Sequence, residues 1–88
     1  MSPTISMFCG IIIRMFLEKG APHHTPDIHA EYQGNNAAFS IPDGEILVGN
    51  MPKRQTRIIQ GWIAEHEEEL LANWQLAMDN EPLFKISK

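Results

Sequence analysis

The sequence predicts one α+β domain over residues 1–88, a small antiparallel β-meander of about four strands packed on one long C-terminal α-helix. Two observations predict it. In the first half, β-branched and aromatic residues form short runs separated by Gly, Pro and Asn, a pattern typical of strands and turns. In the second half, apolar residues recur every three or four positions, as in an amphipathic helix. A chain of 88 residues is long enough for only one such domain.

The predicted strands follow one another along the first half of the chain. Residues 5–17 form the first, because they are rich in Ile, Met and Phe and end before a Gly-Ala-Pro breaker. Residues 28–33 alternate between apolar and polar side chains, which predicts a half-exposed second strand. A Gly-Asn-Asn turn and a Pro-Asp-Gly turn then border the third and fourth strands, at residues 37–41 and 45–48.

The predicted helix spans residues 52–80. Its apolar positions are Ile59, Ile63, His66, Leu70, Trp74 and Ala77. On this stripe His66 is expected to be a hydrogen-bonded core residue, with a ligand role as the alternative. The glutamates around it are expected to form a solvated face. Gly61 weakens the helix by about 1 kcal/mol relative to alanine. Pro82 ends the helix, and residues 83–86 are predicted to add an edge strand.

Charge and cysteine content exclude several classes of function. Seven Lys and Arg against eleven Asp and Glu give a net charge of −4, so overall attraction to nucleic acid or to an anionic membrane is not expected. The single cysteine, Cys9, excludes an intramolecular disulfide and a cysteine-based zinc site, and it favours the reducing cytoplasm. Its place in an apolar run predicts that it lies in the core. That run lacks the features of a signal peptide and is too short to span a membrane.

Three histidines lie close together in the sequence. His23, His24 and His29 fall within seven residues, and Glu31 follows two positions after the last. Imidazole and carboxylate groups bind divalent metals such as zinc, although this spacing matches no standard zinc motif. A catalytic acid–base role is the second alternative. The third is a polar loop and a solvated strand face, with His29 hydrogen-bonded to Glu31.

Arg14 adds a charged group to this set if the first and second predicted strands are neighbours. Arg14, His29 and Glu31 would then share one face of the sheet. A guanidinium, an imidazole and a carboxylate are the groups that metal-free cleavage of a phosphodiester uses. The alternative is a cross-strand ion pair between Arg14 and Glu31 that contributes a few tenths of a kcal/mol.

A cluster of basic residues begins the predicted helix. Lys53, Arg54 and Arg57 lie in its first two turns, where the helix dipole is already positive and disfavours cations. A phosphate or an acidic partner surface would relieve this repulsion, so the three residues are a candidate site for anion or partner binding. Solvation of long side chains is the alternative.

Several segments resemble a bacterial family known as domain of unknown function 4160. The resemblance begins with Pro-Thr-Ile-Ser-Met-Phe-Cys-Gly-Ile-Ile-Ile-Arg-Met at residues 3–15. It continues with Ile-His-Ala-Glu-Tyr at residues 28–32, Ala-Phe-Ser-Ile at residues 38–41 and Met-Pro-Lys-Arg at residues 51–54. Trp62, His66 and Asn-Trp-Gln-Leu-Ala at residues 73–77 complete it. Family members commonly have a second histidine where Asp27 stands here.

The resemblance implies pairing with a second small protein, from domain of unknown function family 2442, in a toxin–antitoxin-like module. Three hypotheses follow. The first is a cytoplasmic toxin neutralised by a small antitoxin-like partner. The second is a small RNA-directed or metal-dependent hydrolase that uses Arg14, His29 and Glu31. The third is a non-catalytic interaction module. No membrane association is expected, and assembly into a homo-oligomer stays open.

Overall fold

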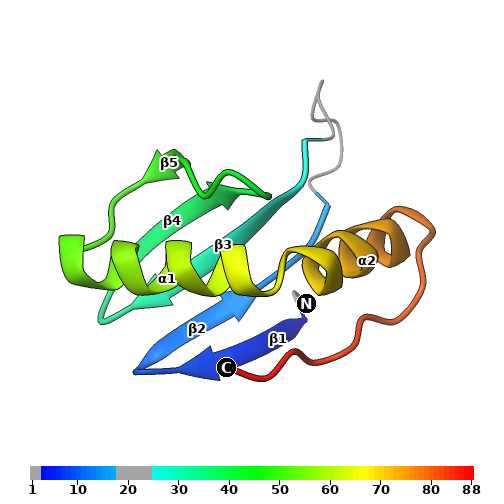
Figure 1. The fold of residues 1–88 in the computed structure, drawn as a ribbon, viewed down its shortest axis with the longest axis horizontal. Helices are drawn as coiled ribbons and strands as arrows, with labels where there is room; N and C mark the ends of the chain where they lie inside the picture. Colours follow the sequence, from blue (N-terminus) through cyan, green and yellow to red (C-terminus); the bar gives the residue numbers. More distant parts are fainter. Residues whose placement is uncertain (1–2, 18–24) are drawn as a thin grey trace.

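The computed structural model describes residues 3–17 and 25–88 as an α+β fold (Figure 1). Five antiparallel strands form one sheet in chain order. They are β1 (Thr4–Phe8), β2 (Ile11–Arg14), β3 (Asp27–Tyr32), β4 (Asn35–Ser40) and β5 (Ile46–Gly49). Two helices, α1 (Lys53–Glu65) and α2 (Glu67–Met78), follow and cover one face of the sheet. The predicted fold class is therefore right, with five strands instead of about four and two helices instead of one.

The segment predicted as the first strand is a β-hairpin. Cys9 and Gly10 connect β1 to β2 with φ angles of 51° and 75°. Two successive residues at positive φ match the right-handed twist of paired strands, and glycine adopts this conformation without steric cost. The sequence did not predict this turn because the residues around it are apolar on both sides. Cys9 is consequently exposed at the tip of the hairpin. The prediction from the sequence that it lies in the core is wrong.

The pairing register assigns each strand residue to one of two faces. On the face away from the helices, called the open face, two cross-strand rows result from the pairing. One row contains Thr4, Arg14, His29, Ala38 and Val48, and the other contains Met7, Ile12, Glu31 and Asn36. Side chains alternate along a strand, so the residues between them lie on the helix-covered face.

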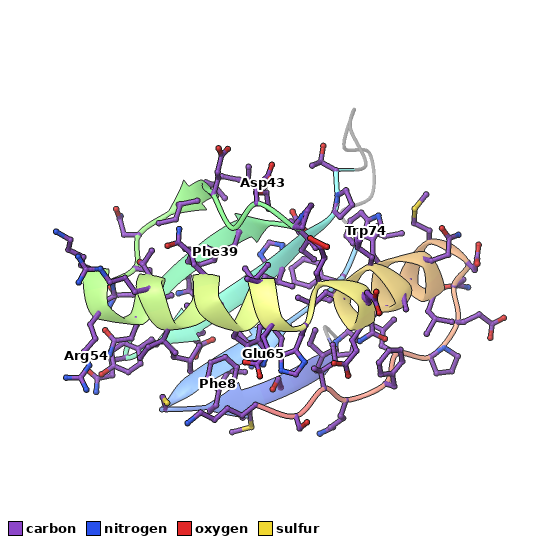
Figure 2. All side chains as sticks on the ribbon, viewed as in Figure 1. Phe8, Phe39, Asp43, Arg54, Glu65 and Trp74 are labelled. Carbon is purple, nitrogen blue, oxygen red and sulfur yellow. The ribbon has the colours of Figure 1, made fainter. Side chains whose placement is uncertain are left out.

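The hydrophobic core lies between the covered face and the helices. Ile11, Ile13, Ile28 and Phe39 contribute from the sheet and are fully buried. The helices supply the opposing side chains, with Ile59, Ile63, Leu70, Trp62 and Trp74 buried against the sheet. Figure 2 labels Phe39 near β4 and Trp74 near α2. This packing explains why the three-and-four spacing of apolar residues continues past the end of α1.

The helical region is interrupted at His66. This residue has φ −112° and ψ 28°, outside the helical region, and it is both the last cap of α1 and the first cap of α2. Glu67, Glu68 and Glu69 consequently occupy the first turn of α2, where the helix dipole stabilises their negative charges. The glutamates lie at a helix start, not in the middle of one long helix. Because the helical region is interrupted at His66, these glutamates lie beside a helix N-terminus and are stabilised there.

The C-terminal segment after α2 lies along β1 but forms no strand at residues 83–86 (Figure 1). The fully buried Asn73 side chain exchanges two hydrogen bonds with the backbone of Phe84, at 2.8 and 3.0 Å. Trp62 Nε1 donates to Ser87 O, and Ile86 N donates to Ile5 O at 2.8 Å. Side-chain hydrogen bonds therefore replace most of the strand pairing that the sequence predicted.

Candidate functional site

The structure brings Arg14, His29 and Glu31 together on the open face. Strands β2 and β3 are antiparallel neighbours, and Arg14 pairs directly with His29. Glu31 pairs with Ile12, two residues before Arg14, and therefore lies diagonally across from the arginine. Long side chains reach such diagonal neighbours in a sheet. The expected shared face is thus present.

An ion pair joins the arginine to the glutamate. Arg14 Nη1 donates to Glu31 Oε1 at 3.0 Å, and the two side chains are 34% and 42% exposed. Water screens a pair at this exposure, so its contribution to stability is small. The guanidinium has further N–H groups besides the one that binds Glu31. Arg14 therefore keeps donors for an anionic ligand while the ion pair holds it in place.

His29 lies among groups that fix the orientation of its ring. Phe16 stacks on the imidazole, with ring centroids 4.2 Å apart and an angle of 18° between the planes. Asp27 Oδ1 lies 3.9 Å from His29 Nε2, and the His29 side chain is 24% exposed. An aromatic contact and a nearby carboxylate both restrict rotation of the ring. The imidazole is therefore oriented on the open face, where part of the ring is exposed and Nε2 itself is buried.

The sequence analysis did not identify Phe16 as a site residue, and it noted Asp27 only as the residue that stands where family members commonly have a histidine. The signal was available for Asp27, because Asp27, His29 and Glu31 alternate along β3 and so share a face. The predicted second strand began one residue too late to include it. Phe16 follows Arg14 by two positions beyond the end of β2. Its contact with His29 depends on which strand neighbours β3, which local pattern does not specify.

The predicted metal site is only partly within the described chain. His23 and His24 lie outside the described residues. Among residues 3–17 and 25–88, no group of three or more His, Cys, Asp or Glu side chains is placed to hold a metal ion. His29 is the one member of the predicted set with a described position. The hypothesis of a site built from the three histidines stays a prediction.

The basic residues lie apart from this set. Lys53, Arg54 and Arg57 are exposed at the start of α1, which packs on the covered face. In Figure 2, Arg54 projects from the left end of the helix. The sheet separates these cations from Arg14 and His29. The structure therefore presents two separate candidate anion sites instead of one continuous site.

His66 is bound within its own helical region. Its Nδ1 lies 2.6 Å from Glu69 Oε1, and its ring is 5.4 Å from that of Trp62. The side chain is only 10% exposed. This geometry agrees with the expectation of a core histidine that has a hydrogen-bond partner.

The family comparison agrees with the sequence resemblance. The model of the family described as Domain of unknown function (DUF4160) matches residues 10–75. The chain belongs to this family. No curated protein and no solved structure matches it.

The DUF4160 match covers the elements that carry the candidate site. It extends from the end of the β1–β2 turn into α2 and contains Arg14, His29 and Glu31 as well as the basic residues of α1. Strand β1 and the C-terminal segment that lies along it fall outside the matched range. Among the described residues, no helix has the length and apolar character needed to cross a membrane.

Proposed function

We propose that this DUF4160 protein is the toxin-like member of a pair, acts on RNA in the cytoplasm and is neutralised by a small protein partner. The observation that supports an RNA-directed activity is the grouping of Arg14, His29 and Glu31 on a sheet face that neither helix covers. The pairing with a neutralising partner rests on the family resemblance.

The proposed reaction is metal-free cleavage of an RNA phosphodiester. The 2′-oxygen attacks phosphorus, the bond from phosphorus to the 5′-oxygen breaks, and a 2′,3′-cyclic phosphate forms. One of His29 and Glu31 accepts the proton of the 2′-hydroxyl, and the other gives a proton to the leaving 5′-oxygen. Arg14 stabilises the negative charge that develops on the phosphoryl oxygens. Asp27 and Phe16 act as positioning residues for the imidazole.

A non-catalytic interaction module is the second candidate, and a separate observation favours it. Arg14 and Glu31 neutralise each other, and the same face exposes two apolar side chains, Met7 at 67% and Val48 at 66%. Apolar surface bordered by polar residues is a feature of protein-interaction sites, and these two side chains lie in the two edge strands, β1 and β5. In this case the protein would block its target by binding instead of cutting it.

Growth of a bacterial host separates these functions. Induction of the chain alone is expected to arrest growth, and co-expression of the neighbouring gene is expected to relieve the arrest. His29→Ala should abolish toxicity, and the matched control Asn36→Ala, on the same open face, should leave it intact. Toxicity that persists in a folded His29→Ala protein would favour the interaction module. The absence of arrest with folded wild-type protein would contradict the toxin proposal.

Purified protein tests the chemistry directly. We expect the wild-type chain to cut RNA in the presence of EDTA and to leave 2′,3′-cyclic phosphate ends. Arg14→Ala and His29→Ala should each reduce the rate by about 10²-fold or more, the usual effect of losing an acid–base or charge-stabilising group. The triple alanine variant of Lys53, Arg54 and Arg57 should weaken RNA binding without changing the ends. Activity that needs added zinc would instead support the histidine metal site.

A further inference from the structure

The two edges of the sheet differ in what lies beside them. Strand β1 has the C-terminal segment next to it, and Ile86 N donates to Ile5 O at 2.8 Å. Strand β5 forms the other edge and pairs only with β4 in the sheet order. In Figure 1, no described segment lies beyond β5 on its outer side. One edge is therefore partly covered by the chain itself, and the other is open.

The open edge strand is apolar. All four residues of β5 are exposed, and its three large side chains are Ile46 at 41%, Leu47 at 49% and Val48 at 66%. Edge strands of monomeric proteins usually contain a charge, a proline or a β-bulge that hinders pairing with another chain. Ile46–Gly49 contains neither a charge nor a proline, and its register with β4 shifts between Ala38 and Phe39. Gln60 Nε2 donates to Gly44 O at 2.8 Å and holds the preceding turn against α1. The strand is thus held in position, and within residues 3–17 and 25–88 its only strand partner is β4.

Opposite charges flank this strand. Asp43 and Glu45 precede β5 and are exposed, and Lys53 and Arg54 follow it at the exposed start of α1. Figure 2 shows Asp43 beside the turn before β5 and Arg54 at the start of α1, below that helix in this view. An antiparallel copy of the same edge would reverse this order. The acidic end of each copy would then face the basic end of the other, so the edge is complementary to itself.

We propose that two copies of this chain pair antiparallel through β5. Backbone hydrogen bonds between the two strands would join two five-stranded sheets into one continuous sheet, with a two-fold axis perpendicular to it. Both open faces then lie on the same side. Five strand spacings separate the two β3 strands, which places the two copies of His29 about 24 Å apart across the sheet. This pairing does not depend on the proposed RNA chemistry.

A charge exchange between two variants tests the arrangement. One variant combines Asp43→Lys with Glu45→Lys, and the other combines Lys53→Glu with Arg54→Glu. Sedimentation equilibrium should show that the wild-type mass doubles from 10.0 kDa with rising concentration. Each variant alone should stay monomeric, because like charges meet at both ends. An equimolar mixture should recover the doubled mass. Variants that dimerise alone, or a mixture that stays monomeric while the wild type dimerises, would overturn the antiparallel arrangement.

A second pair of variants tests the strand itself. Leu47→Lys places a charge in the middle of β5 and should abolish the doubled mass. Met7→Lys is the matched control, because Met7 is an exposed apolar residue in the other edge strand. It should leave dimerisation unchanged. Circular dichroism verifies that both variants fold. A wild-type chain that stays monomeric at every concentration, or a folded Leu47→Lys variant that still dimerises, would overturn the proposal.

Discussion

The covered face and the open face of the sheet belong to the same strands and yet have opposite properties. Ile13 and Ala30 point into the core and are almost completely buried, whereas their neighbours Arg14 and His29 remain accessible to solvent. Burial of apolar area stabilises the fold, and exposed charge pairs contribute little to it. The comparison suggests a division in which one face determines stability and the other is free to carry chemistry or binding.

Adjacent isoleucines on β2 give the strongest test of this division. Ile13→Ala removes a fully buried side chain and should lower the free energy of unfolding by about 2–5 kcal/mol. Ile12→Ala removes the same atoms from the half-buried open face and should cost at least about 1 kcal/mol less, because less area returns to water. Urea unfolding followed by tryptophan fluorescence measures both. Equal losses would show that the open face also contributes to the core.

Asn73 tests whether the covered side depends on a polar contact as well. Asn73→Ala leaves the backbone groups of Phe84 without their partners and should cost about 1–3 kcal/mol. The C-terminal segment should also become more sensitive to trypsin at Lys85. Gln75→Ala is the control, since Gln75 is exposed on the same helix. Unchanged proteolysis of a folded Asn73→Ala protein would mean that other contacts hold the segment.

Gly61 tests the exposed side of α1. A Cβ at this position meets no atom within 4 Å, and the φ angle is compatible with alanine. Gly61→Ala should therefore stabilise the protein by about 0.5–1 kcal/mol. At Gly49, with φ 90°, a Cβ would overlap the backbone oxygen of Asn36, so Gly49→Ala should destabilise. Thermal unfolding should shift in opposite directions for the two variants, and shifts of the same sign would contradict this reasoning.

The smallest expected effect lies on the open face. A double-mutant cycle with Arg14→Ala and Glu31→Ala should give a coupling energy of about 0.2–1 kcal/mol, the usual range for an exposed pair. Raising the salt concentration should reduce it further. A coupling larger than that of typical buried contacts would show that the ion pair holds the β2–β3 pairing together. The division between the two faces would then be incomplete.

Local patterns in the sequence determined much of this fold. The alternation along β3, the three-and-four spacing in the helical region and the turn residues between strands all result from short-range physical preferences. They were sufficient for the α+β class and for most element positions. They were insufficient where one composition suits two structures. The apolar run around Cys9 suits either one long strand or a hairpin, and Gly10 was the only local sign of the turn.

Local patterns also predicted part of the candidate site. Two-residue alternation places His29 and Glu31 on one face of a strand, and this needs no knowledge of the fold. Their proximity to Arg14 depends on β2 being the neighbour of β3, and the contact with Phe16 depends on the register between them. Register is a property of pairing between strands. It is fixed when apolar side chains of several strands are buried together.

By itself, the sequence of this DUF4160 protein determined the class of fold, the apolar stripes and the residue types that were available for chemistry. Three features could be seen only in the tertiary structure. They are the break in the helical region at His66, the sheet face that the helices leave open and the sheet edge that lies beside the C-terminal segment. These features arise from contacts between residues far apart in the chain. Such contacts depend on the packing of the whole molecule, whereas local preference depends only on a residue and its near neighbours.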